Sequence, residues 1–412
     1  MNEAISKNFF KVSIIFFIFY LLFAGYYFRR VYQPWGTCDT DFTVFTRAAE
    51  RIAQKKDIYQ SSYLETGRDY YKYSPAFAVF MVALSKLHKH ISVPIWYFSI
   101  FVFFMASIFL TKKILAAENK EKILSKTFYF LGILMSLRFL LSTIQRVQSD
   151  CLALFLLSLF IFALFRKKEA LAGLSLAAAS MVKLTPLIFL PYLLWRRRIK
   201  AALACGLFIV LFLLAPSLYA GWAKNLGYLK NWLLVHQKNP VDYIFWYKNQ
   251  SLLSCLMRFL SKDSQISILN LTQGQVYIIF LVLAAALLSL IFILRRKARP
   301  EEKGFVFLTD ISLVLILMIL LSPLGWKHTF VHLTIPHLVL LYYALYKNPA
   351  DKVTKGLLVG SFFFNTILNP EITGPFAKTV QLYSSVTVGT LILYVALLRV
   401  GNNANADNHS YL

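Results

Sequence analysis

The sequence predicts an all-α polytopic integral membrane protein, from its composition, its apolar segments and the placement of its basic residues. Hydrophobic residues make up 58% of the 412 residues and charged residues only 15%, whereas about a quarter of a soluble globular protein is charged. Several uncharged stretches approach the roughly 20 residues with which a helix crosses a hydrocarbon core of roughly 30 Å. The net charge of +25 gathers in short clusters between these stretches, as the cytoplasmic preference of basic residues predicts.

The clearest membrane spans are the long apolar segments. They are residues 12–28, 93–111, 127–144, 149–165, 201–222, 276–294, 304–323, 329–346, 356–370 and 380–398. Lys7 and Lys11 precede the first segment, and no small-residue cleavage site follows it. We therefore expect a retained first span rather than a cleaved signal peptide.

A further apolar run, between the basic clusters at 166–168 and 196–198, contains Lys183 as its one charged residue and Pro186 shortly after it. Because both flanking clusters are basic, both are expected on the cytoplasmic side, and an even number of crossings must fit between them. We predict two short helices that meet near Lys183. Broken helices at membrane depth usually line a cavity.

Placing the basic clusters inside gives about 12 crossings with both termini in the cytoplasm. Residues 75–87 then form a short or re-entrant helix on the outer side. A full crossing there would reverse the orientation of the span at 93–111. The whole chain, 1–412, is predicted to be one transmembrane domain with two long outer loops, 29–74 and 223–275. Such long loops are usually functional, and the excess of lysine and arginine in the second favours an anionic ligand.

Several classes of function are disfavoured by what the sequence lacks. The basic residues lie at membrane junctions, so we expect no nucleic-acid partner. The cysteines have no metal-ligand spacing, although Cys38 and Cys255, both in expected outer loops, leave a disulfide open. The chain contains no P-loop or GxGxxG motif. We expect no metal and no soluble cofactor, and the oligomeric state is not predicted.

The first outer loop contains candidate site residues. Asp39 and Asp41 precede an amphipathic pattern over 42–53 that predicts a helix at the membrane interface. Either carboxylate is explained by helix capping or by a role as general base for a hydroxyl. Tyr73 fits an interfacial aromatic belt or a sugar contact.

Ionisable and amide side chains within or beside spans are costly in the membrane and are therefore informative. They are Arg138, Arg146, Gln148, Asp150, Lys183, Asp310 and His328. Arg146 and Asp150 have the spacing of a helical ion pair. Lys183 is interpreted as a cation for phosphate, with snorkelling to the surface as the alternative. His328 suits a phosphate donor or a merely solvated side chain, and Asn249 begins a formal glycosylation sequon.

Taken in order, short motifs of the chain resemble glycosyltransferase family 87, membrane enzymes of the GT-C superfamily that use polyprenyl-phosphate-linked sugars. The motifs are Asp41-Phe42-Thr43-Val44, Tyr73-Ser74-Pro75, Gln148, Gly173, Lys183-Leu184-Thr185-Pro186, Asn249-Gln250-Ser251 with Arg258, and Ser322-Pro323 with Trp326 and His328. Three positions depart from the family pattern: Val147 stands where glycine is usual, Asp150 where a neutral residue is usual, and Thr329 where a second histidine is usual.

The resemblance implies a GT-C-type fold and an inverting transfer of a sugar, mannose by default, from a polyprenyl-phosphate donor to a glycolipid or glycan acceptor. Asp41 takes the position of the catalytic base, with Asp39 as the fallback and, with Tyr73, a possible acceptor or sugar contact. The implied donor-binding residues are Arg146, Gln148, Lys183, Asn249, Gln250, Ser251, Arg258, Trp326 and His328. The implied setting is the outer face of a bacterial cytoplasmic membrane.

A secondary transporter or a lipid-linked-sugar translocator is the alternative class, because short helices and intramembrane charge suit it as well. No internal repeat relates the halves of the chain, and two long outer loops are atypical of transporters. A transporter should tolerate loss of Asp41 far better than loss of Lys183.

Overall fold

The computed structural model describes residues 2–31, 40–59, 71–118, 124–295, 304–368 and 370–409. Within these ranges the chain is helical, and the β pairing present is an isolated bridge between Ser261 and Leu271. Seven helices in the described ranges are long and apolar enough to cross a membrane. The helical membrane class is therefore confirmed, while the total of about 12 crossings and the GT-C architecture remain predictions.

The chain forms two compact units, each assembled from separated stretches of sequence. One unit contains residues 1–12, 108–140 and 240–412, and the other contains residues 13–107 and 141–239. We call them unit 1 and unit 2. Four of the described helices run through a boundary between these ranges: α1 (Asn2–Val31), α4 (Lys89–Glu118), α5 (Lys126–Arg146) and α11 (Trp222–Asp242).

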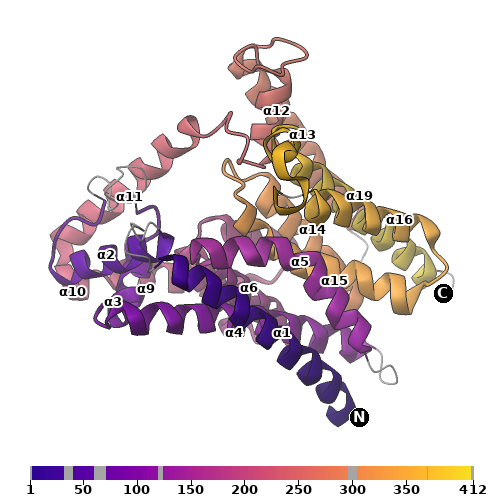
Figure 1. Cartoon of the computed structure of the whole chain (residues 1–412), viewed down its shortest axis with the longest axis horizontal. Coiled ribbons are helices and arrows are strands. Elements are labelled where there is room, and N and C mark those ends of the chain that lie inside the picture. Colours follow the sequence, from indigo (N-terminus) through magenta and orange to yellow (C-terminus); the bar gives the residue numbers. More distant parts are fainter. Residues whose placement is uncertain are drawn as a thin grey trace. The chain divides into compact units, whose positions relative to one another are not determined.

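Unit 2 is built mainly from short helices (Figure 1). They are α2 (Asp41–Ala53), α3 (Pro75–Ser85), α6 (Asp150–Phe165), α7 (Glu169–Val182), the 3₁₀ turn η1 (Thr185–Ile188), α8 (Phe189–Trp195), α9 (Ile199–Leu214), α10 (Ser217–Ala220) and α11 (Trp222–Asp242). Helix α7 packs between α6 and α9. A Cβ atom on Gly173 would lie 2.5 Å from Cβ of Ala204, so the close approach of α7 to α9 requires glycine there.

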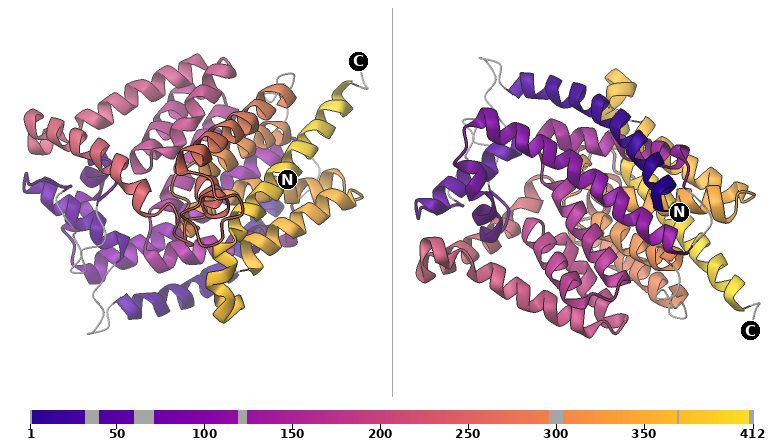
Figure 2. Two further views of the ribbon diagram at one scale, coloured as in Figure 1. Left: turned by 90° about the horizontal axis from the view of Figure 1, so that it is seen from above. Right: turned by 90° about the horizontal axis from the view of Figure 1, so that it is seen from below.

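Unit 1 contains the remaining helices, and Figure 2 shows α16 and α19 side by side. The elements are α12 (Leu252–Leu260), α13 (Gln273–Arg295), α14 (Gly304–Leu320), η2 (Lys327–Leu333), α15 (Thr334–Tyr342), η3 (Tyr343–Lys347), α16 (Lys352–Phe362), η4 (Phe363–Ile367), α17 (Pro370–Thr373), η5 (Gly374–Phe376), α18 (Ala377–Leu382) and α19 (Ser385–His409). Every residue of α14 is buried, which makes this largely apolar helix, with Asp310 as its one ionisable residue, the core of the unit.

Two of the long apolar helices leave most of their surface uncovered by the protein. Only 17% of the most apolar part of the segment Ile199–Ala220 is buried, and only 11% of that of Gln273–Leu294. Water-facing surfaces of this length and composition are not found on soluble monomers, which rarely expose apolar patches beyond a few hundred Å². Both helices therefore present a face suited to lipid, as a membrane-embedded protein requires.

The expected break in the chain at Lys183 is confirmed. Helix α7 ends at Val182, Lys183 is extended with φ −145° and ψ 139°, and η1 begins two residues later with Pro186 in its first turn. The expected short helix after residue 74 is α3, which begins with Ser74 as N-cap and Pro75 at the first helical position, a favoured start. Its 11 residues are too few to cross the hydrocarbon core.

Candidate functional site

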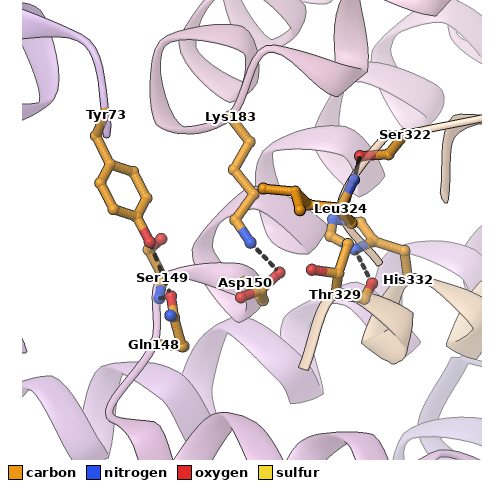
Figure 3. Close-up of polar contacts among 9 residues, drawn as sticks. All are labelled: Tyr73, Gln148, Ser149, Asp150, Lys183, Ser322, Leu324, Thr329 and His332. Carbon is orange, nitrogen blue, oxygen red and sulfur yellow. Dashed lines mark hydrogen bonds and ion pairs between the residues drawn. The ribbon is translucent and has the colours of Figure 1, made fainter. Parts of the chain in front are cut away.

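The centre of the candidate site in unit 2 is a buried ion pair. Lys183 Nζ lies 2.6 Å from Asp150 Oδ1, and the side chains are 17% and 0% exposed, respectively. The two residues meet because α6 and α7 are successive antiparallel helices of similar length, so the start of α6 and the end of α7 come to the same end of the hairpin. Figure 3 shows the ammonium group directed at the carboxylate.

The position of Asp150 at the start of α6 also favours its charged form. Asp150 lies in the first turn of the helix, where the positive end of the helix dipole stabilises an anion. The sequence suggested a helical pair between Arg146 and Asp150. That interpretation is wrong, because α5 ends at Arg146 and Val147 has φ +54°, which breaks the helix between the two residues. Arg146 is exposed.

A hydrogen-bonded pair of neutral side chains lies next to Asp150. The Tyr73 hydroxyl donates to Gln148 Oε1 at 3.0 Å, and the backbone N–H of Ser149 donates to the same oxygen at 3.2 Å (Figure 3). Burial, followed by the negative charges of Asp41 and Asp150, raises the pKa of Tyr73 well above its ordinary value of 10.0. Tyr73 therefore stays a neutral hydrogen-bond donor, and its hydroxyl lies within electrostatic reach of both carboxylates.

Asp41 reaches this region from the first turn of α2. Thr40 is the N-cap residue, so Asp41 is the first residue of the helix rather than its cap. One turn further along the same face of α2, Phe45 packs its ring edge-on against Tyr73 with 4.7 Å between ring centroids. Asp41 is half-buried, so the carboxylate combines partial shielding from water with access for a substrate. Asp39 and Cys38 lie outside the described residues.

In unit 1, Arg258 is a fully engaged buried cation. It is 1% exposed. Its guanidinium donates to the carbonyl oxygens of Leu382, Trp246 and Asn249 at 2.8–3.0 Å and to the hydroxyls of Ser254 and Ser384 at 2.6 Å. These contacts favour a structural role for Arg258, and the phosphate contact predicted for it remains untested.

The three residues Asn249, Gln250 and Ser251 belong to the same network and are 0% exposed. Asn249 Nδ2 donates to the carbonyl of Pro323 at 3.0 Å, and Ser251 Oγ donates to the same carbonyl at 3.2 Å. Gln250 Nε2 donates to the carbonyl of Gln381 at 2.8 Å. Burial removes the Asn249 sequon from solvent, and the predicted donor contacts of these residues stay predictions.

Trp326 and His328 are half-buried at the start of η2. The ring of Trp326 contacts the rings of Tyr243 and Trp246. Figure 3 also labels Ser322, whose hydroxyl donates to the carbonyl of Leu324 at 3.0 Å and so fixes the turn before Trp326. Among the described residues, no group of three or more histidine, cysteine, aspartate or glutamate side chains is arranged to hold a metal ion.

The pairing of Asp150 with Lys183 and the link from Tyr73 to Gln148 are the features that the sequence did not reveal. A usable signal existed for the first, because two apolar helices of equal length joined by a basic turn must bring residues near 150 and 183 together. No comparable signal existed for the second, since 75 residues separate Tyr73 from Gln148.

Fold and site together define a polytopic helical membrane protein with ionisable groups held inside its helical units. The chain belongs to glycosyltransferase family 87, whose sequence model matches residues 71–323. It is therefore a membrane glycosyltransferase that moves a sugar from a donor to an acceptor. The matched stretch contains Tyr73, Gln148, Lys183 and Arg258, whereas Asp41 precedes it. No curated protein sequence matches the chain.

Proposed function

We propose that the protein transfers a sugar, mannose by the family default, from a polyprenyl-phosphate donor to a glycolipid or glycan acceptor, with inversion at the anomeric carbon. The proposed setting is the outer face of a bacterial cytoplasmic membrane. The observation that carries the proposal is the ion pair of Lys183 with the buried Asp150, beside which Gln148 accepts a hydrogen bond from Tyr73, whose ring packs on Phe45 of the helix that begins at Asp41. A base and a cation within one small region are what a displacement from phosphate requires.

In the proposed step, Asp41 removes the proton of an acceptor hydroxyl as its oxygen attacks the anomeric carbon. The bond from that carbon to the phosphate oxygen breaks, and polyprenyl phosphate leaves with the electron pair. A phosphate leaves as an anion, so the step needs no second carboxylic acid of the kind that protonates the leaving oxygen in glycosidases. The proposal includes no metal ion and no soluble cofactor.

Lys183 is the residue proposed to hold the leaving phosphate. A lysine ammonium has three N–H donors. One of them goes to Asp150, and none of the hydrogen bonds in the described part of the chain uses the other two. The ammonium is also partly exposed, at 17%. It can therefore keep its buried partner while a phosphate oxygen accepts a second, charge-assisted hydrogen bond.

The remaining proposed contacts are those that the family motifs imply. Gln148 is held by Tyr73 and Ser149 beside Asp150, which suits it to orient a sugar hydroxyl. Arg146 is exposed at the end of α5 and would meet phosphate from the solvent side. Trp326 and His328 are proposed to contact the donor from η2.

The test is transfer of label by the purified protein in nanodiscs. Short-chain radiolabelled polyprenyl-phosphate-mannose is the donor, and a glycolipid extract is the acceptor. Asp41→Asn should lose about 10²–10⁴-fold in rate, the usual contribution of a positioned base. Glu50→Gln is the matched control, because Glu50 is an exposed acid on the same helix, and it should retain the wild-type rate.

Other outcomes redirect the proposal. Transfer that survives in Asp41→Asn would keep the glycosyltransferase and move the base, with Asp39 as the next residue to change. If the wild-type protein does not transfer mannose, other polyprenyl-phosphate sugars are tested as donors. Silence with every such donor, together with movement of the intact donor across the bilayer, would favour the translocator.

A further inference from the structure

Unit 1 contains a cluster of aromatic rings outside the ion-pair site. The rings of Tyr243, Trp246 and Trp326 lie in mutual contact, with centroids 5.4 Å, 5.5 Å and 5.4 Å apart for the three pairs. Trp246 is 37% exposed, and the other two rings are half-buried. We call these three residues the aromatic platform. The cluster offers an open π surface rather than a closed core.

The backbone under the platform is held by buried side chains. Asn249 Nδ2 donates to the carbonyl of Tyr243 at 3.3 Å, and Arg258 Nη1 donates to the carbonyl of Trp246 at 3.0 Å. Gln250 Nε2 donates to the carbonyl of the adjoining Tyr247 at 2.7 Å. All three donors are at most 1% exposed. The backbone of the segment 243–247 is therefore held in place by hydrogen bonds from buried side chains.

The same network fixes the segment that carries Trp326. Asn249 Oδ1 accepts a hydrogen bond from the backbone N–H of Gly325 at 2.8 Å, and the backbone N–H of Gln250 donates to the carbonyl of Gly325 at 2.8 Å. A Cβ atom on Gly325 would lie 2.6 Å from the backbone nitrogen of Ser251, so only glycine permits this approach. Both segments of the platform are thus preorganised by one buried network, as a binding surface requires.

Two ammonium groups border the rings. Lys248 Nζ lies 5.0 Å from the centroid of the Trp246 ring, and Lys378 Nζ lies 6.0 Å from that of Tyr247. The face of an aromatic ring carries partial negative charge, which attracts both the ammonium groups and the slightly positive C–H face of a sugar. The surface therefore combines a stacking face for a pyranose ring with nearby charge for an anion.

We propose that the aromatic platform is a saccharide-binding subsite, which stacks a pyranose ring on Trp246 and holds an adjoining phosphate near Lys248. Asn249, Gln250 and Arg258 act as positioning residues for it. The proposal rests on the proposed function in that the substrate is a sugar. An interfacial aromatic belt is the simpler explanation for tryptophan and tyrosine in a membrane protein, but a belt does not need the buried network that fixes three carbonyls within residues 243–247.

The test measures binding rather than transfer. Wild-type protein in nanodiscs is titrated with radiolabelled short-chain polyprenyl-phosphate-mannose, with the same lipid phosphate lacking sugar, and with mannobiose. Trp246→Leu should bind the sugar-bearing probes about tenfold more weakly, the scale of one lost aromatic stacking contact, and should bind the sugar-free lipid phosphate unchanged. Trp222→Leu is the matched control, because Trp222 is 58% exposed and lies in unit 2.

A second variant separates stacking from folding. Trp246→Phe keeps a ring and should recover part of the lost binding, whereas a general loss of structure would not be repaired by phenylalanine. Equal binding of sugar by Trp246→Leu, Trp222→Leu and wild type would overturn the subsite. The subsite would also be overturned if the wild-type protein bound the sugar-free lipid phosphate as tightly as the sugar-bearing lipid and did not bind mannobiose.

The source of the sugar follows from the same titrations. If Trp246→Leu weakens only polyprenyl-phosphate-mannose, the platform serves the donor; if it also weakens mannobiose, the platform serves the acceptor. The two proposals also fail separately. Sugar binding that depends on the platform, without any transfer, would support the subsite and contradict the proposed transferase mechanism. Sugar transfer by a protein whose affinity for sugar does not depend on the platform would support the mechanism and contradict the subsite.

Discussion

Arg258 in unit 1 and Lys183 in unit 2 are both buried cations that suit contact with phosphate, yet their surroundings differ. Arg258 is 1% exposed and donates to five protein acceptors. The side chain of Lys183 is 17% exposed and forms an ion pair with Asp150. A saturated guanidinium has little left to offer a ligand, whereas an ammonium with one partner retains donors. Among cations in a membrane protein, remaining donor capacity therefore separates structural from ligand-binding roles.

The largest effect is expected from Arg258→Met. The change leaves three buried carbonyls and two hydroxyls without their donor, and each unsatisfied group costs about 1–3 kcal/mol. We expect a loss of stability of at least ~3 kcal/mol, seen as a fall in apparent Tm or as failure to fold. Arg29→Met, at an exposed arginine, is the control and should leave the Tm unchanged. A stable but inactive Arg258→Met would instead place the guanidinium at the substrate.

Lys183→Met is expected to slow the reaction, and it is made in the Asp150→Asn background as well, because removing Lys183 alone leaves the buried Asp150 carboxylate without its cation and lowers the Tm. Loss of one preorganised charge at a leaving group typically costs about 10²–10³-fold in kcat. Lys230→Met, at an exposed lysine of α11, is the matched control. Steady-state transfer assays and Tm measurements on both variants test whether Lys183 holds the leaving phosphate. A wild-type kcat in Lys183→Met would contradict that role.

Asp150 is expected to act through Lys183 rather than on the substrate. Asp150→Asn keeps the shape of the side chain but loses the ion pair, so the ammonium is held less firmly and kcat should fall by about 10-fold. In the double variant Lys183→Met/Asp150→Asn, the change at Asp150 should cause no further loss of kcat, because the effects of coupled residues are not additive. Independent, multiplying effects of the two changes would show that Asp150 contacts the substrate directly.

The sequence was sufficient for the class of fold and for the break at Lys183, because bilayer thickness sets helix length and Pro186 with two basic flanks leaves few alternatives. It did not reveal the pairing of Asp150. The helix break that keeps Asp150 from pairing with Arg146 depends on the left-handed conformation of Val147, which no β-branched residue signals. The network of Asn249 and Arg258 was equally hidden, since Arg258 donates to Leu382 and Ser384, which lie 124 and 126 residues away in the sequence.

Val147 gives a smaller and more specific test of the turn between α5 and α6. Its φ of +54° is costly for any residue with a Cβ, by about 1–2 kcal/mol. Val147→Gly relieves this strain. Val147→Ala loses buried methyl groups and keeps the strain. We therefore expect the glycine variant to be the more stable of the two, by about 1 kcal/mol or less once the extra freedom of unfolded glycine is included. Glycine is the poorer residue by about 1 kcal/mol in an ordinary helix, so a higher Tm for the alanine variant would contradict the assigned conformation.

The smallest effect concerns Asp351, a carboxylate that caps a helix instead of pairing in the interior. It accepts hydrogen bonds from the backbone N–H and the hydroxyl of Thr354 at 3.0 Å and 2.7 Å, and these lower its pKa below the ordinary 3.8. A depressed folded-state pKa stabilises the protein above the unfolded-state pKa, and this contribution is lost as the pH falls through the folded-state value. Asp351→Ala should therefore cost about 1 kcal/mol at neutral pH, with the difference from wild type shrinking below pH about 4. Asp351→Asn retains a capping oxygen without a titrating charge, so at neutral pH its Tm should lie between those of Asp351→Ala and wild type. A deficit of Asp351→Ala that stays constant down to the lowest measurable pH would show that the carboxylate charge contributes nothing to the cap.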